Sequence, residues 1–184
     1  GTGSGSLASS SAVTSDSAGI ATSPAWTLGT TAGANTLTAT SGSLSGSPFT
    51  FTATGTPGAA TQLAVTTSAA GAASGAAFTT QPVVTVRDAV GNTVTGSTAA
   101  VTMTVNTGAT TVGTVTVNAV AGVATFSGVG ISGTAGTSYT LTFASTGLTS
   151  ATQSITPQRE PLVSWRSLHL LLDLSAEQHS RRNQ

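Results

Sequence analysis

Along most of this chain, apolar side chains alternate with Thr and other small polar residues, the period of half-buried β-strands. The alternation is clearest at Val101, Met103 and Val105, which share one face of a predicted strand. It recurs at Leu141 and Phe143. Turn signals rich in Gly, Asp, Asn and Pro separate such stretches at roughly 8 to 12-residue intervals. The pattern predicts about seven or eight short strands in residues 59–156, forming an antiparallel β-sandwich.

Earlier residues show the same period more weakly. Strands are predicted on both sides of a tight turn in residues 13–21, where Asp16 and Gly19 supply the turn residues. Two further strands are expected at residues 34–40 and 47–53. In the complete set of strands that follows, the alternation changes phase near Gly128, which predicts a bulge or bend there.

Part of the chain is repeated about 100 residues further on. Residues 19–33 (GIATSPAWTLGTTAG) align without a gap with residues 122–136 (GVATFSGVGISGTAG). A repeat of about 100 residues has the size of one small β-domain. We therefore expect a fragment of a longer protein: the C-terminal part of a repeat at residues 1–58, a complete repeat at 59–156, and an unrelated tail at 157–184.

The amino-acid composition excludes several kinds of partner and binding site. Charged residues make up 5% of the chain, the net charge is zero, and Cys is absent. Without a basic patch interleaved with aromatics, we expect no nucleic-acid partner. Absent cysteine excludes disulfides and thiolate metal sites. The sequence also lacks a run of roughly 18 apolar residues, so no membrane span is expected in this fragment.

Catalytic groups are scarce. Residues 1–156 contain only three charged side chains, those of Asp16, Arg87 and Asp88. Each aspartate lies three residues before a Gly, so turn formation explains it better than general acid–base chemistry, which needs paired titratable groups. Ser and Thr are abundant but lack a neighbouring base. We expect no enzyme, no catalytic residues and no cofactor.

Two pairs of residues were considered as possible metal sites. Asp88 and Asn92 could offer oxygens to calcium, but calcium takes six to eight oxygens and this chain supplies one carboxylate per turn. His169 and His179 lack further zinc ligands nearby. We therefore expect no metal.

Aromatic side chains offer a second kind of candidate site. Trp26 and Tyr139 could stack on sugars, yet their alternation with Leu residues favours core positions. Tyr139 is also expected to place its hydroxyl on a backbone group.

Several stretches resemble bacterial Ig-like repeats, the kind found in invasin- and intimin-like adhesins. The resemblance rests on turn and core motifs and covers about residues 10–156. The motifs that carry it are FTTQPVVTVRD at residues 78–88, GNTV at 91–94, GVATF at 122–126, residues 32–40, and SGSP at 45–48. It implies an Ig-like β-sandwich in a surface or secreted protein, located on the bacterial cell surface or outside the cell.

The function that this resemblance implies is structural: a spacer repeat of an adhesin-like stalk, whose partners are the neighbouring Ig-like repeats. The alternative is a carbohydrate- or receptor-binding Ig-like module that uses its loops, with a host receptor or glycan as its partner. A binding signal retained by residues 59–156 alone would favour the alternative.

The tail at residues 157–184 departs from this composition. It holds four of the five Arg residues and both His residues. Residues 164–178 could form an amphipathic helix, although a disordered tail is also compatible with this sequence. A shifted reading frame or a cloning scar explains so abrupt a change more simply than an evolved module. The other reading is a native peptide that packs on the sandwich or on a partner.

Overall fold

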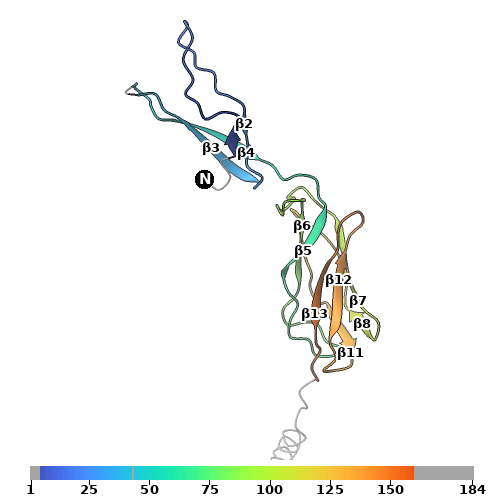
Figure 1. The fold of residues 1–184 in the computed structure, drawn as a ribbon. Coiled ribbons are helices and arrows are strands. Elements are labelled where there is room, and N and C mark those ends of the chain that lie inside the picture. Colours follow the sequence, from blue (N-terminus) through green and yellow to red (C-terminus); the bar gives the residue numbers. More distant parts are fainter. Residues whose placement is uncertain (1–4, 43, 160–184) are drawn as a thin grey trace, which may run out of the picture.

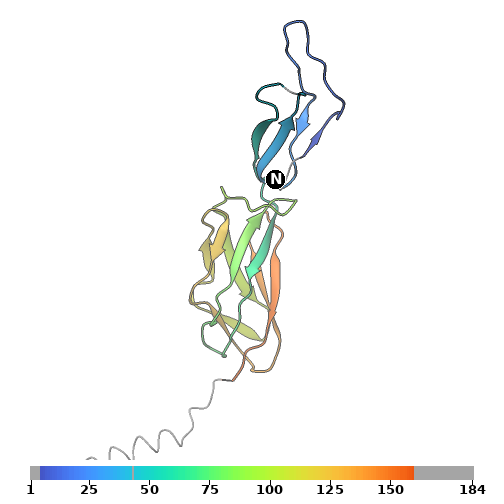
Figure 2. The same ribbon diagram turned by 90° about the vertical axis from the view of Figure 1, so that its left-hand side faces the viewer.

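The computed structural model describes residues 5–42 and 44–159, and these residues form β-strands and turns without any helix. All pairings between its strands are antiparallel, which confirms the expected all-β class. The strands fall into two groups, placed end to end in Figures 1 and 2. Residues 5–55 are called the N-terminal unit below, and residues 62–155 the C-terminal unit.

The C-terminal unit is built from two main sheets and a separate strand pair, an arrangement compatible with a β-sandwich. One sheet has the order β10-β6-β5 and the other β13-β12-β7-β9, while β11 pairs with β8. The strands are β5 (Gln62–Thr67), β6 (Val83–Arg87), β7 (Ala100–Val105), β8 (Ala109–Val112), β9 (Thr116–Asn118), β10 (Val123–Thr125), β11 (Gly130–Gly133), β12 (Tyr139–Ala144) and β13 (Ala151–Ile155).

The core of this unit lies between the sheets. Alternate apolar residues of β6, β7 and β12 point inward, as the sequence pattern predicts, and the Thr residues between them are less buried. Phe126 packs on Phe143 with ring centroids 5.5 Å apart. The fully buried apolar positions include Val84, Val86, Val101, Met103, Ile131, Leu141 and Phe143.

A bend after β10 carries the chain from one sheet to another strand pair. Strand β10 pairs with β6, whereas β11 pairs with β8. Between them Gly128 has a φ of 68°, in the left-handed region that glycine adopts without strain. This confirms the bend expected near Gly128. Strand β8 was not expected, because its sequence Ala-Thr-Thr-Val offers no alternating large apolar residues.

The N-terminal unit is smaller and more open. Its strands are β1 (Ser6–Leu7), β2 (Trp26–Thr27), β3 (Gly33–Ala39) and β4 (Phe49–Gly55). The β3–β4 hairpin confirms the strands expected at residues 34–40 and 47–53, and it pairs Gly33 with Gly55 through to Ala39 with Phe49. Phe49 and Phe51, two residues apart in β4, share a face of the hairpin, but they remain 59% and 49% exposed.

One local expectation was wrong. The turn at Asp16 and Gly19 forms, but the residues on either side of it in 13–21 are not strands. A strand requires a neighbouring ladder, and within residues 5–42 and 44–159 no strand pairs with this segment. The expected helix at residues 164–178 falls outside the described residues. None of the described residues belongs to a helix long and apolar enough to cross a membrane.

Candidate functional site

The turn at residues 88–92 lies where the two units meet, and its own sequence explains its shape. Asp88 Oδ1 accepts hydrogen bonds from the backbone N–H groups of Val90 (3.0 Å) and Asn92 (2.8 Å). The backbone closes the turn through Asp88 N–H to Asn92 O (3.0 Å). Gly91 has a φ of 95°, which a residue with a side chain rarely adopts. The spacing Asp-x-x-Gly-Asn therefore specifies this turn locally.

The second carboxylate oxygen of Asp88 reaches the chain that joins the units. Asp88 Oδ2 accepts hydrogen bonds from Gly58 N–H (2.9 Å) and from the side-chain amide of Asn92 (2.8 Å). Gln62 Nε2 donates to the Asp88 carbonyl oxygen (2.8 Å). Asp88 is 3% exposed, so this network holds the start of the C-terminal unit in one conformation.

Asn92 extends this network to the N-terminal unit. Its Oδ1 accepts a hydrogen bond from Ala32 N–H (2.9 Å), and its Nδ2 donates to Thr30 O (2.9 Å) as well as to Asp88. One side chain thus binds the backbone of a loop about 60 residues earlier in the sequence at two points. We call Asp88, Asn92, Gly58, Thr30 and Ala32 the junction network.

The hydrogen bonds change the acidity of Asp88. They lower its pKa from 3.8 to about 2, and the bond from the Asn92 side chain is the largest cause. Burial acts in the opposite direction, while the backbone N–H groups of Gly58, Asn92 and Val90 lower the pKa further. Asp88 is therefore ionised at neutral pH and accepts hydrogen bonds through both oxygens, as a structural anchor requires.

The Asp16 turn repeats this local geometry without the link. Asp16 Oδ1 accepts hydrogen bonds from Ala18 N–H and Ile20 N–H, both at 2.9 Å, and Asp16 N–H donates to Ile20 O. Both aspartates form turns, as the sequence predicts. Asp16 is exposed, and its side chain accepts hydrogen bonds from residues of the same turn. Comparison of the two turns therefore shows that Asp-x-x-Gly specifies the turn itself, whereas Asn92 adds the hydrogen bonds to the N-terminal unit.

Chemistry at the junction network is limited by what surrounds Asp88. Each carboxylate oxygen already accepts two N–H groups, so binding a cation there requires these bonds to break. Arg87, next to Asp88 in the chain, donates a hydrogen bond through Nε to Thr85 Oγ1 (3.1 Å). Among the described residues, no three His, Cys, Asp or Glu side chains group as metal ligands. His169 and His179 lie outside the described residues.

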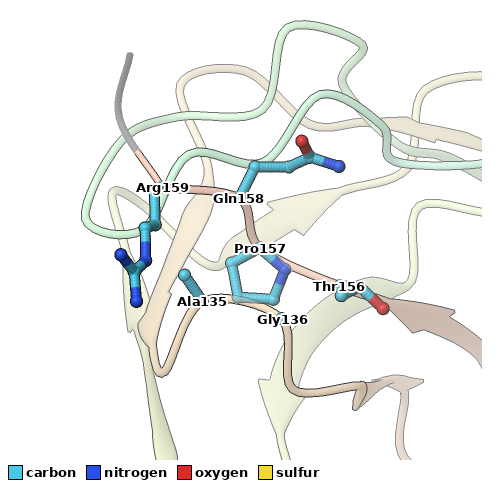
Figure 3. Close-up of a pocket in the computed structure, with 6 residues that line it drawn as sticks. All are labelled: Ala135, Gly136, Thr156, Pro157, Gln158 and Arg159. Carbon is cyan, nitrogen blue, oxygen red and sulfur yellow. The ribbon is translucent and has the colours of Figure 1, made fainter. Parts of the chain in front are cut away.

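A shallow hollow at the other end of the C-terminal unit offers little for catalysis. Ala135 and Gly136 line one side of it, and residues 156–159 line the other (Figure 3). The side chains of Gln158 and Arg159 point in different directions (Figure 3). Arg159 is the one ionisable side chain in this lining, so the hollow lacks a pair for acid–base chemistry.

The aromatic candidates belong to the framework to different degrees. Tyr139 is 5% exposed and its hydroxyl accepts a hydrogen bond from Thr134 N–H (2.9 Å), which confirms the expected core position and backbone contact. Trp26 lies in β2 and is partly buried. In the repeat, Asn35 of the N-terminal unit takes the place of Tyr139. It is fully buried, and like Tyr139 it accepts a hydrogen bond from the backbone, here from Gly29 N–H to Asn35 Oδ1 (3.0 Å).

Sequence reasoning identified the turn but missed its partners. Asn92 was considered as a turn residue and as a calcium ligand, Gly58 as part of the turn-rich boundary between the repeats, and residues 30–32 only as part of the repeated sequence. The signal available was an Asn directly after the Asp-x-x-Gly turn, with a Gly-containing linker upstream; nothing in it specifies contact with Ala32.

No protein-family model matches this chain, and no curated protein matches it either.

Proposed function

We propose that this chain is a non-catalytic structural spacer from a bacterial cell-surface or secreted protein, part of an adhesin-like stalk of Ig-like repeats. Its work is to hold neighbouring units in line. The observation that carries this proposal is the junction network, in which Asn92 binds Thr30 and Ala32 of the preceding unit while it also binds Asp88.

A spacer needs a junction that resists bending, and the two bonds from Asn92 to one loop restrict rotation of that loop about the linker. Asp88 holds Gly58 within the linker itself. The anchor has a low pKa, so it keeps its charge at any pH above about 4. Such a junction suits a protein exposed to varying surroundings outside the cell.

The experiment compares the tumbling of the two units by ¹⁵N relaxation in the full chain. We expect one shared rotational correlation time for the unaltered chain. Asn92→Ala removes the bonds to Thr30 and Ala32, and it should give two distinct times, with faster tumbling of the smaller N-terminal unit. The matched control is Asn118→Ala, at an exposed residue in β9, which should preserve a single time.

Independent tumbling in the unaltered chain would contradict the spacer proposal, because the junction would then not transmit orientation. Equal behaviour of Asn92→Ala and the unaltered chain would remove the junction network as its basis.

A further inference from the structure

The first and last segments of the C-terminal unit, residues 61–74 and 149–158, lie side by side. The chain enters this unit at the end beside the N-terminal unit and leaves it at the opposite end (Figures 1 and 2). The two isolated β-bridges that join the segments are parallel and pair Gln62 with Thr149 and Ala73 with Gln158. The segments therefore run in the same direction along the length of the unit, and we call them the terminal pair.

Backbone hydrogen bonds hold the terminal pair at both of its ends. Two bonds lie near the N-terminal unit and two lie at the far end, and each end has the reciprocal pattern of a parallel ladder. The four bonds are Thr149 N–H to Thr61 O (2.9 Å), Leu63 N–H to Thr149 O (2.9 Å), Gln158 N–H to Ala72 O (2.6 Å) and Ser74 N–H to Gln158 O (3.2 Å).

The side chain of Gln153 joins the same two segments between these ends. Its Oε1 accepts a hydrogen bond from Ala69 N–H (2.8 Å), and its Nε2 donates to Ala69 O (3.1 Å). Gln153 lies opposite the fully buried Leu141, so it shares the inward face of β13 with the apolar residues Ala151 and Ile155. An amide in this apolar row supplies a third attachment where the two backbones do not bond directly.

Tension along the molecule would load these three attachments together. A pull on the linker before residue 59 draws the first segment towards the N-terminal unit, and a pull on residue 159 draws the last segment the opposite way. The segments would then have to slide past each other, and every hydrogen bond across them would resist the sliding at once. A pull on both segments from the same end would instead break the bonds one after another.

We propose that the C-terminal unit has a second function, to bear tensile force along the chain, and that Gln153 reinforces the terminal pair for this purpose. All of these hydrogen bonds lie within the C-terminal unit, so the inference does not depend on the junction network. Cys is absent from the chain, and Arg87 and Asp88 are the only charged residues between positions 61 and 158. Neither of them belongs to the terminal pair, so hydrogen bonds rather than covalent or ionic links resist the sliding.

The test holds single molecules of the full chain at constant force and measures how long they survive before unfolding. Because the chain has no Cys, thiols introduced at exposed positions are the only points of attachment. Ala59→Cys with Arg159→Cys loads the terminal pair along its length, whereas Ala59→Cys with Thr146→Cys pulls both segments from one end. We expect lifetimes about tenfold longer, or more, in the first direction, because forced unfolding follows the unfolding rate.

Two glutamines distinguish reinforcement of the terminal pair from general stability. Gln153→Ala removes both bonds to Ala69 and should shorten the lifetime about tenfold in the first direction, with a smaller effect in the second. The matched control, Gln81→Ala, removes bonds to the backbone of Phe78 and Val129, which lie outside the terminal pair. It should change the lifetimes in both directions by the same factor.

Equal lifetimes in the two directions would overturn the proposal, and this comparison leaves Gln153 and Gln81 unaltered. Equal effects of Gln153→Ala in both directions would also overturn it, because the amide would then support only the general stability of the unit. A larger effect of Gln81→Ala than of Gln153→Ala in the first direction would place the resistance outside the terminal pair.

Discussion

Phe143 is fully buried at the centre of the C-terminal unit, where its ring packs against Phe126 at 5.5 Å. We expect Phe143→Ala to lower the free energy of unfolding by about 3–5 kcal/mol, because it leaves a cavity that the surrounding strands cannot fill. Urea denaturation measures this change. Phe49→Ala, at a Phe that is 59% exposed, should change it by less than about 1 kcal/mol. A loss below about 1 kcal/mol for Phe143→Ala would contradict the core assignment.

Asp88 gives a pH dependence whose sign can be stated. Its pKa is about 2 in the folded chain against 3.8 ordinarily, so its stabilising contribution is complete above pH 3.8 and is lost as pH falls towards 2. Urea midpoints measured from pH 5 to pH 2 should therefore fall less for Asp88→Asn than for the unaltered chain. Asp16→Asn serves as the control for a turn aspartate outside the junction network. Identical pH profiles for the unaltered chain and Asp88→Asn would contradict the assignment.

Strand β11 depends on a close approach that only glycine permits. Gly130 pairs with Ala77 through a β-bridge, and Phe78 N–H donates to Val129 O (2.8 Å). A Cβ at Gly130 would meet backbone atoms of both neighbours, including the Ala76 carbonyl carbon at 2.8 Å and Ala77 Cα at 2.9 Å.

We therefore expect Gly130→Ala to destabilise the C-terminal unit by about 1–3 kcal/mol, because the backbone of residues 76–77 must shift. Gly96→Ala is the matched control, since a Cβ there meets no atom within 4 Å. Thermal unfolding of both variants distinguishes them. Equal midpoints would show that residues 76–77 move aside at no cost.

Over the whole molecule, one repeat pattern has two structural outcomes. The β12–β13 hairpin is covered by the opposite sheet and flanked by β7, whereas β3–β4 carries the same alternation with its Phe residues exposed. The buried apolar cluster belongs entirely to the C-terminal unit. The junction network therefore connects a well-packed unit to one held mainly by a single hairpin.

Much of this arrangement could be predicted from local sequence patterns. Alternation at Val101, Met103 and Val105 indicated an inward face, and Gly128 indicated the bend, because each signal acts within a few residues. Strand β8 was not predicted, and the strands expected on either side of the Asp16 turn do not form. Whether a short Thr-rich stretch becomes a strand depends on a distant partner, here β11, and a single sequence does not specify that pairing.

The sequence by itself determined the β class, the turn at Asp88, the repeat, and the scarcity of titratable groups, since each follows from composition or from residues adjacent in the chain. Only the tertiary structure decided which segments Asn92 and Gln153 bind. Those outcomes depend on loops and strands far apart in sequence, which come together only when burial of the core positions them. Asn92 and Ala32 are 60 residues apart, and their hydrogen bond exists only because the folded units meet there.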